Sequence, residues 1–502
     1  MRWLTAVAIG AGLLAPATPA QAENADIGTY LKRHAAAHHI PGLAAAVVRD
    51  GRVVQTVTLG EDGNGAKVTT QTPFLLGSVS KPVTALAVTQ LVEAGRVDLD
   101  TPVRRYLPWF DLRDEAAAAA ITVRHLLTHT SGLPEIATTG LTDRFDNTPG
   151  GLDRAVRDLS TLDDTTEPGA RHEYSDANYA VLGALVAAVS GQSFGTYLRR
   201  NVLDPLGMRH SATTAAEADA IGLPPGHRMW FGRPVRFDSP FDTAGVPYGY
   251  LAASLDDTTR FVAAQLGGGA GILSPQGIEL THTGLADTGN GRYGLGWRDS
   301  TSDSGARLVW HAGATPGYFA HIVLSPDTRT GVVVLSNVYS LAMDPALASA
   351  AFDVAAIMRG ERPDPRPADN TFTYVLGGLV LLAVGLVVAI VRAPWKARGR
   401  PVPWLLGGGA LATAVVVGLP AAAGAGLRQV LLWTPDVGWT GVTVAALAVL
   451  LGLTRAGTIT YRRFRSAPRP AGSDDRTATP APDHTPTHAA DRPGSASPHP
   501  PR

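Results

Sequence analysis

The chain has 502 residues, of which 45% are hydrophobic and 17% charged, and its formal net charge is +0. The length allows about two or three domains, and the balanced charge gives no reason to expect a nucleic acid or an acidic partner. There is no cysteine, which excludes disulfides, thiol nucleophiles, cysteine metal ligands and lipid anchors on cysteine.

The N-terminus has the composition of a secretory signal peptide. Arg2 precedes an apolar run, and the small residues Ala20 and Ala22 flank a glutamine in a small-x-small pattern. We expect cleavage before Glu23, so that residues 1–22 are removed and the mature N-terminus lies outside the cytoplasm. An uncleaved membrane anchor is the alternative.

Residues 23–362 are predicted to form one exported domain. The stretch GLAAAVVRDGRVVQTVTLG indicates two strands joined by a tight turn at Asp50-Gly51, and ARLVWHAG, GYFAHIVLS and TGVVVLSN indicate three later strands. Helical patterns lie between them in KPVTALAVTQLVEAG, NYAVLGALVAAVSG and FGTYLRRNVLDPLG. Strands at both ends and helices in the middle predict an α+β fold, in which both ends of the domain build an antiparallel sheet flanked by helices.

The stretch FLLGSVSKPVTALAV, which begins at Phe74, places serines and a lysine where an apolar strand gives way to a helix. If Ser78 lies at the helix N-terminus, Lys81 falls one turn later on the same face, and its amine can reach the Ser78 hydroxyl. A serine becomes a good nucleophile when a neighbouring base takes its proton, and a lysine can be that base in its neutral form. The alternative is a helix cap at Ser80 beside a solvated lysine.

A second motif, PGARHEYSDANYAVLG, places Tyr174 just before a helical pattern and Asp176 two residues later. A tyrosine with a lowered pKa can act as a general base or relay protons. The alternative is an ordinary helix start, with Ser175 or Asp176 as the N-cap and Tyr174 as a packing residue.

A third motif, VWHAGATPGY, places His311 and Gly313 at the end of a predicted strand. Gly313 would permit a close backbone approach, and the N–H of Ala314 could face a ligand. Together with the N–H of Ser78 it could form an oxyanion hole. The alternative is a strand end followed by a plain turn.

In this order, the S-x-x-K, Y-S-D and H-x-G motifs resemble the serine beta-lactamase and penicillin-binding-protein superfamily. More narrowly, they are similar to its class C beta-lactamase-related branch of esterases, D-peptidases and DD-carboxypeptidases, with a sheet and a mainly helical subdomain. The stretches ITVRHLLTHTSGLP, PLGM and YGLGW agree; within the first of these, we interpret Thr128 and His129 as structural. The resemblance extends from about His39 to Ser340.

The resemblance implies that Ser78 is the acylated nucleophile and Lys81 its partner, while Tyr174 passes protons between Ser78 and the leaving group. Asp176 stands where the family usually has asparagine, so a negative group that only accepts hydrogen bonds replaces an amide. That change should suit an ester or a small amide better than an anionic substrate. The superfamily needs no metal and no organic cofactor.

The resemblance also implies that His311 and Gly313 line the opposite wall, and that the N–H groups of Ser78 and Ala314 hold the oxyanion. Beta-lactamases and many carboxypeptidases have Lys-Thr-Gly where this chain has a histidine, Ala312 and a glycine. The hydroxyl is absent, and a histidine of ordinary pKa, about 6.5, is only partly charged at neutral pH. We therefore expect weaker recognition of a substrate carboxylate.

A membrane region is predicted at 372–455, after a linker at 363–371. The uncharged run at 372–391 is long enough to cross a bilayer, and further spans are predicted at 404–423 and 437–453. None of the three contains an acidic or basic residue, so anchoring is favoured over transport.

The basic residues around these spans predict their orientation. They lie between the first two spans and after the third (Arg392, Lys396, Arg398, Arg400, Arg455, Arg462, Arg463, Arg465), whereas the loop between spans two and three offers Arg428 against Asp436. The positive-inside rule places the two basic segments in the cytoplasm and the large domain outside, in agreement with a signal peptide. The tail at 466–502, rich in proline, serine, threonine and alanine, should be disordered and cytoplasmic.

These features predict a membrane-anchored extracytoplasmic serine hydrolase of esterase or D-amino-acid peptidase type, which cleaves an ester or amide through an acyl-Ser78 intermediate. One alternative is a penicillin-binding-like or sensor domain that is acylated slowly without efficient turnover; another is a true beta-lactamase or DD-carboxypeptidase. The expected partners are a small-molecule or peptide substrate outside the cytoplasm and the lipid bilayer. No feature points to an oligomeric state.

Overall fold

The structure, a computed structural model, describes residues 19–135, 140, 142–162, 166–363, 370–396, 398–422 and 424–467. Most of the predicted signal peptide, most of the predicted linker and nearly all of the tail lie outside these residues. The described chain begins with helix α1 (Pro19–Ala37), so cleavage before Glu23 stays a prediction.

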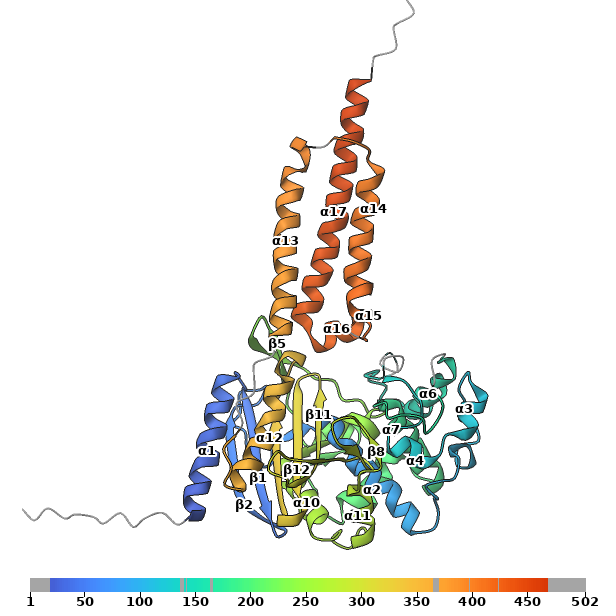
Figure 1. The fold of residues 1–502 in the computed structure, drawn as a ribbon, viewed down its shortest axis with the longest axis vertical. Helices are drawn as coiled ribbons and strands as arrows, with labels where there is room; N and C mark the ends of the chain where they lie inside the picture. The colour runs from blue at the N-terminus through green and yellow to red at the C-terminus, as the bar shows by residue number, and fades with distance from the viewer. Residues whose placement is uncertain are drawn as a thin grey trace, which may run out of the picture.

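An eight-stranded antiparallel sheet, built from both ends of the N-terminal domain, confirms the predicted fold (Figure 1). In spatial order its strands are β2 (Arg52–Gly60), β1 (Gly42–Arg49), β13 (Thr330–Ser336), β12 (Tyr318–Ser325), β11 (Arg307–Thr315), β10 (Arg298–Thr301), β9 (Arg292–Tyr293) and β8 (Ala286–Asp287). Strand β1 pairs with β13, so that Ala45 lies opposite Val334. The first and last long strands of the domain therefore close the sheet together.

The predicted turn between β1 and β2 has the backbone that its sequence requires. Asp50 and Gly51 both have positive φ, 50° and 74°. Two successive residues in this region form the tight hairpin turn whose twist matches that of the flanking strands, and Asp-Gly is a favoured pair there.

Helices cover both faces of the sheet. On one face α1 packs beside α12 (Asp344–Met358), and a buried apolar cluster joins them to the sheet. On the other face, a larger cluster joins the sheet to α2 (Ser80–Glu93), α10 (Leu255–Leu266) and α11 (Pro275–His282).

The middle of the chain forms the mainly helical part of the domain. Its helices are α3 (Glu115–Ala120), α4 (Val123–Leu127), α6 (Gly151–Arg157), α7 (Asp176–Ser190), α8 (Phe194–Leu198) and α9 (Ala215–Ala220). Two small sheets are separate from the main sheet: β3 (Pro73–Leu75), β7 (Ala252–Ser254) and β4 (Ser211–Ala212), and β14 (Val338–Tyr339), β5 (Gly226–Trp230) and β6 (Arg233–Phe237). Helices α2 and α7 both begin where this part meets the main sheet, and the candidate site lies there.

Long apolar helices follow the N-terminal domain. They are α13 (Thr371–Lys396), α14 (Val402–Thr413), which continues through a π-helical turn into α15 (Leu419–Ala422), and α17 (Pro435–Ser466), with a short helix α16 (Leu427–Trp433) between the last two. In Figure 1, α13, α14 and α17 form a bundle, and α16 lies at the end of the bundle next to the N-terminal domain.

Four helical stretches in the described residues are long and apolar enough to cross a membrane: Leu341–Met358, Thr371–Trp395, Val402–Ala422 and Pro435–Ser466. The bent pair Asp176–Ser190 and Phe194–Leu203 would add a fifth. The first stretch contains α12 and the bent pair contains α7, and both helices pack inside the N-terminal domain. The other three are candidate spans and correspond to the three predicted ones, although α17 extends well beyond 437–453.

Candidate active site

The side chains of Ser78 and Lys81 meet at the start of α2. Strand β3 ends at Leu75, a 3₁₀ turn (η1, Gly77–Val79) carries Ser78, and α2 begins at Ser80. Lys81 Nζ donates to Ser78 Oγ at 2.9 Å, as their spacing predicts. Ser80 is not the N-cap of α2; its hydroxyl donates to Gly77 O at 2.8 Å and braces the turn.

Lys81 is fully buried, and each of its three donors has an acceptor. Besides Ser78, Nζ donates to Asp176 Oδ1 at 2.6 Å and to Tyr248 O at 2.9 Å. The sequence led us to consider a neutral lysine that acts as a base. The structure instead surrounds Nζ with three acceptors, one of them a carboxylate, which is the environment of an ammonium group.

Tyr174 does not have the lowered pKa that a tyrosine general base would need. Burial and the negative charge of Asp176 raise the pKa of Tyr174 well above its usual range, although a hydrogen bond with Ser78 opposes this shift. The Tyr174 ring stacks on His129 with centroids 4.3 Å apart, and Lys81 Nζ lies 4.8 Å from the ring centre. Tyr174 is therefore a neutral phenol at the site.

The third predicted motif lies directly against the serine turn. A Cβ atom on Gly313 would be 2.3 Å from Leu76 O and 2.4 Å from Ser78 N, and one on Gly77 would be 2.3 Å from Ala314 N. Side chains at either position would clash with backbone. The two glycines thus allow β11 and the turn to touch, which brings the backbone nitrogens of Ser78 and Ala314 to one place.

The buried imidazole of His311 belongs to a hydrogen-bond chain. His311 Nδ1 lies 2.7 Å from Ala312 O and therefore carries the proton, so Nε2 accepts from the Tyr293 hydroxyl at 3.0 Å. His129 Nε2 lies 3.3 Å from the same hydroxyl, and His129 Nδ1 accepts from the Ser175 N–H at 3.1 Å. The Tyr293 hydroxyl thus accepts from His129 Nε2 and donates to His311 Nε2.

His311 is neutral in this environment. Burial, followed by the charges of Lys81 and Arg298, lowers the pKa of His311 well below its usual range. The sequence led us to expect a partly charged imidazole at neutral pH, and this expectation is wrong. A neutral His311 cannot replace the cation of the Lys-Thr-Gly motif.

Arg298, which we missed in the sequence, supplies a cation at the site. It begins β10 and immediately follows the YGLGW stretch, which was noted only as far as Trp297. Its guanidinium carbon lies 5.7 Å from the ring centres of both Tyr174 and Tyr293 and 5.3 Å from that of Trp310. A basic residue after that stretch was the signal that could have revealed it.

Tyr248 was also missed. It contributes a backbone carbonyl to Lys81 from 167 residues further along the chain. A carbonyl is present at every residue, so the sequence offers no signal for this contact. It depends entirely on where η6 (Val246–Tyr250) packs.

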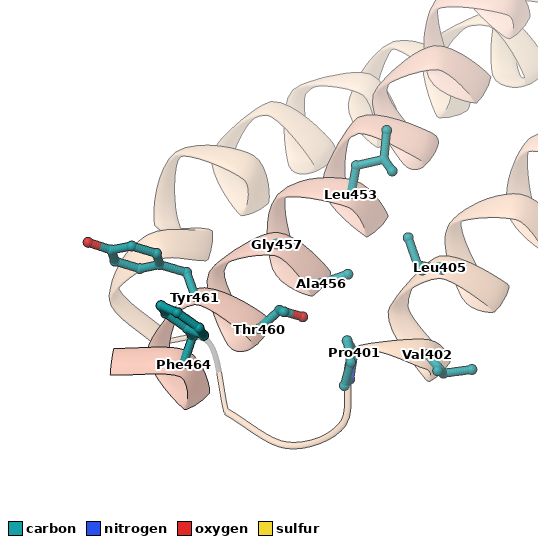
Figure 2. A pocket seen from close by; sticks show the side chains of 9 residues that line it. All are labelled: Pro401, Val402, Leu405, Leu453, Ala456, Gly457, Thr460, Tyr461 and Phe464. Atoms are coloured by element: carbon teal, nitrogen blue, oxygen red, sulfur yellow. The ribbon is translucent and has the colours of Figure 1, made fainter. Parts of the chain in front are cut away.

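The apolar helices carry a groove that lies apart from this site. Figure 2 shows an open apolar groove of about 660 Å³ between α14 and α17, with Leu405 facing Leu453 and Ala456. No nucleophile with a neighbouring base lies among its lining residues. Within the described residues, no group of three or more histidine, aspartate or glutamate side chains could hold a metal ion.

Comparison with known proteins identifies relatives of the N-terminal domain. A family model described as Beta-lactamase matches residues 27–356. Protein flp of Staphylococcus aureus (strain MRSA252) is 28% identical over 324 residues, which are 62% of this chain and 63% of that protein. Penicillin-binding protein 4 of Amycolatopsis lactamdurans is 31% identical over 315 residues, 60% of this chain and 81% of that protein.

The solved structures give a consistent result. The octameric penicillin-binding protein homologue from Pyrococcus abyssi matches with a TM-score of 0.61 at 26% identity, over 70% of this chain and 81% of that chain. This chain spans 63% of the length of the Staphylococcus protein. Helices α13 to α17 lie beyond the region that the family model matches.

Proposed function

The chain belongs to the beta-lactamase family, and from this we propose that it is a serine hydrolase that forms an acyl-enzyme on Ser78. The observation that carries the proposal is the hydrogen bond of 2.9 Å between Lys81 Nζ and Ser78 Oγ, in a turn held against Gly313 and Ala314. A positioned nucleophile beside a proton-transfer group and two backbone donors has the parts that acyl transfer needs.

In the proposed acylation step, Ser78 Oγ attacks the substrate carbonyl carbon and forms the new C–O bond. Its proton passes to Lys81 Nζ while Lys81 passes a different proton to Asp176 Oδ1, so that the carboxylate is the final acceptor. The oxyanion accepts from the N–H groups of Ser78 and Ala314. When the tetrahedral intermediate collapses, the relay runs backwards and the leaving amine or alkoxide takes the proton.

Tyr174 has a different part in this scheme. Because its raised pKa keeps the phenol protonated, we assign to Tyr174 a hydrogen bond to the leaving atom instead of the role of general base. Water then attacks the acyl-enzyme, and the Lys81–Asp176 pair again takes the proton and returns it to Ser78 Oγ.

For the substrate, we propose a peptide or amide with a carboxylate near the scissile bond, as in a D-amino-acid peptidase. Arg298 supports this choice over a neutral ester because its charge lies beside Tyr174 and His311, and among the described residues Arg298 forms no ion pair. The name of the Amycolatopsis relative indicates penicillin binding, and penicillins also carry a carboxylate. A true beta-lactamase or DD-carboxypeptidase is therefore an alternative.

We further propose that α13, α14–α15 and α17 anchor the domain outside the cytoplasm. The outward faces of these helices are apolar, with Leu381 and Leu406 largely exposed. Arg463 donates to Gly399 O at 2.8 Å, so the basic residues after α13 and near the end of α17 gather at one end of the bundle. The N-terminal domain lies at the opposite end in Figure 1, as the positive-inside rule requires.

The test is intact-mass analysis of the full chain in detergent micelles after incubation with a fluorophosphonate. We expect one adduct on wild type, none on Ser78→Ala and slower labelling of Lys81→Ala. If the folded wild type takes no adduct, the serine is not activated and the proposal fails.

A second candidate is a sensor that is acylated and hardly turns over. The contacts between α16 and the N-terminal domain favour it, because they would connect the site with the membrane helices. The lifetime of the acyl-enzyme formed from an ester or from a peptide that ends in D-alanine, followed by intact mass, separates the two functions: loss within seconds supports a hydrolase, and persistence for hours supports a sensor.

A further inference from the structure

Helix α16, between the second and third candidate spans, is hydrogen-bonded to the N-terminal domain. The Arg428 guanidinium donates to Asp143 O and, at 3.4 Å, to Thr142 O, and lies 5.9 Å from the centre of the Phe145 ring. Trp433 Nε1 donates to the side-chain oxygen Asp143 Oδ2 at 3.0 Å. Two side chains of α16 thus converge on one aspartate.

Asp143 is itself buried and holds two tyrosines of η6. Its side chain accepts from the Tyr250 hydroxyl at 2.6 Å, and its backbone N–H donates to the Tyr248 hydroxyl at 3.4 Å. Only 5% of Asp143 is exposed, and its φ of 54° is unusual for a residue other than glycine. The surrounding contacts must maintain a backbone conformation of this kind.

The same segment η6 is bonded to α2 on its other side. Tyr248 O accepts from Lys81 Nζ, and Pro247 O accepts from Thr84 Oγ1 at 2.7 Å. Hydrogen bonds therefore connect Trp433 through Asp143 to Tyr250 in η6. The backbone of η6 then leads to the Tyr248 carbonyl, which holds Lys81.

This chain of hydrogen bonds depends on the donor from α16 because Asp143 is a buried acid. Burial raises the pKa of Asp143, whereas its hydrogen bonds with Tyr250 and Trp433 and the charge of Arg428 oppose this shift. Without α16, one carboxylate oxygen would lose its donor inside the protein. An unsatisfied buried acceptor is costly enough that water entry or movement of η6 would relieve it.

We propose that Asp143 is a positioning residue, and that α16 docks on it and thereby sets the place of the Tyr248 carbonyl that holds the Lys81 ammonium beside Ser78. The part of this inference that concerns catalysis rests on the proposed function. It also gives the second and third spans a purpose. A single span would leave the remaining chain in the cytoplasm. The second span returns the chain to the outer side, where α16 reaches the domain, and the third span follows α16.

The test uses the full chain in detergent micelles with the variant Trp433→Phe, which removes the Nε1 donor but keeps a ring against Tyr339. The matched control is Trp439→Phe, because Trp439 lies on α17, is 53% exposed and, among the described residues, makes no side-chain hydrogen bond or ring contact with the N-terminal domain. One measurement is the rate constant for fluorophosphonate labelling of Ser78. The other is amide hydrogen exchange across residues 246–251, which does not depend on activity.

We expect Trp433→Phe to label about 5- to 30-fold more slowly than wild type and to exchange faster at 246–251, with Trp439→Phe unchanged in both. Combined with Tyr250→Phe, the losses in rate should be less than multiplicative, because both variants act through Asp143. A purely anchoring role for α16 would produce neither effect.

Unchanged exchange at 246–251 in Trp433→Phe overturns the inference, whether or not wild type is acylated. Faster exchange without slower labelling of an active protein also overturns it. If wild type takes no adduct and exchange still rises, the docking of α16 on η6 is supported and the proposed function alone fails.

Discussion

Lys81 and Asp176 form an ion pair, with 2.6 Å between Nζ and Oδ1, although they are 95 residues apart in the chain. The lysine side chain is fully buried, whereas that of the aspartate is 34% exposed. The pair joins the start of α2 to the start of α7. A carboxylate at this position gives the serine–lysine pair a second proton acceptor, which an asparagine could not be.

Asp176→Asn should therefore slow acylation of Ser78 by about 100-fold, the range of a lost general base. The free energy of unfolding should also fall by about 2 kcal/mol, between the values for exposed and buried ion pairs. Labelling kinetics and urea unfolding measure the two effects. Labelling at the wild-type rate would show that the proton does not go to Asp176.

Gly313→Ala should abolish labelling of Ser78. The new methyl group would lie 2.3 Å from Leu76 O, so β11 or the serine turn must move apart, and the pair of oxyanion donors is lost with them. The control is Gly28→Ala, since that glycine lies in α1 with no atom within 4 Å of the added carbon. The control should label normally and gain up to about 1 kcal/mol in stability. Normal labelling of a folded Gly313→Ala would contradict the proposed oxyanion hole.

Arg298→Gln should separate substrates that carry a carboxylate from those that do not. For a peptide that ends in D-alanine we expect kcat/KM to fall by about 10- to 100-fold, the loss of one charge-assisted hydrogen bond to a carboxylate. For a neutral ester of similar size, kcat/KM should stay within about twofold. Equal losses for both substrates would assign Arg298 to the architecture of the site instead of to substrate recognition.

His282 should make the protein less stable in mild acid. Burial is the largest cause that lowers its pKa from 6.5 to about 3. The folded state therefore favours the neutral imidazole, and its contribution to stability is complete above pH 6.5 and is lost as the pH falls toward 3. Between pH 7 and pH 5 the loss is about 2 kcal/mol, since one pH unit corresponds to about 1.4 kcal/mol.

Urea unfolding of the full chain at pH 7 and pH 5 measures this loss. His282→Gln should reduce the difference between the two pH values by about 2 kcal/mol. His39→Asn is the control, because His39 is exposed and asparagine tolerates its positive φ of 53°. The same pH dependence in wild type and His282→Gln would contradict the role of the buried imidazole.

The sequence determined those features of this protein that depend on neighbouring residues. The one-turn spacing of Ser78 and Lys81 predicted their contact because the helix repeat places such residues on one face. Asp50-Gly51 predicted its turn because few residue pairs accept two positive φ values. The candidate spans follow from uncharged apolar runs, since the cost of burying charge in lipid depends mainly on composition.

The tertiary structure alone decided the charges and the distant partners of the site. Lys81 meets an aspartate and the carbonyl of Tyr248 from far along the chain, and Tyr174 and His311 are neutral because the fold buries them. The docking of α16 on Asp143 likewise joins segments 290 residues apart. Burial and long-range approach are properties of the packed chain, and the residue types within one motif do not contain them.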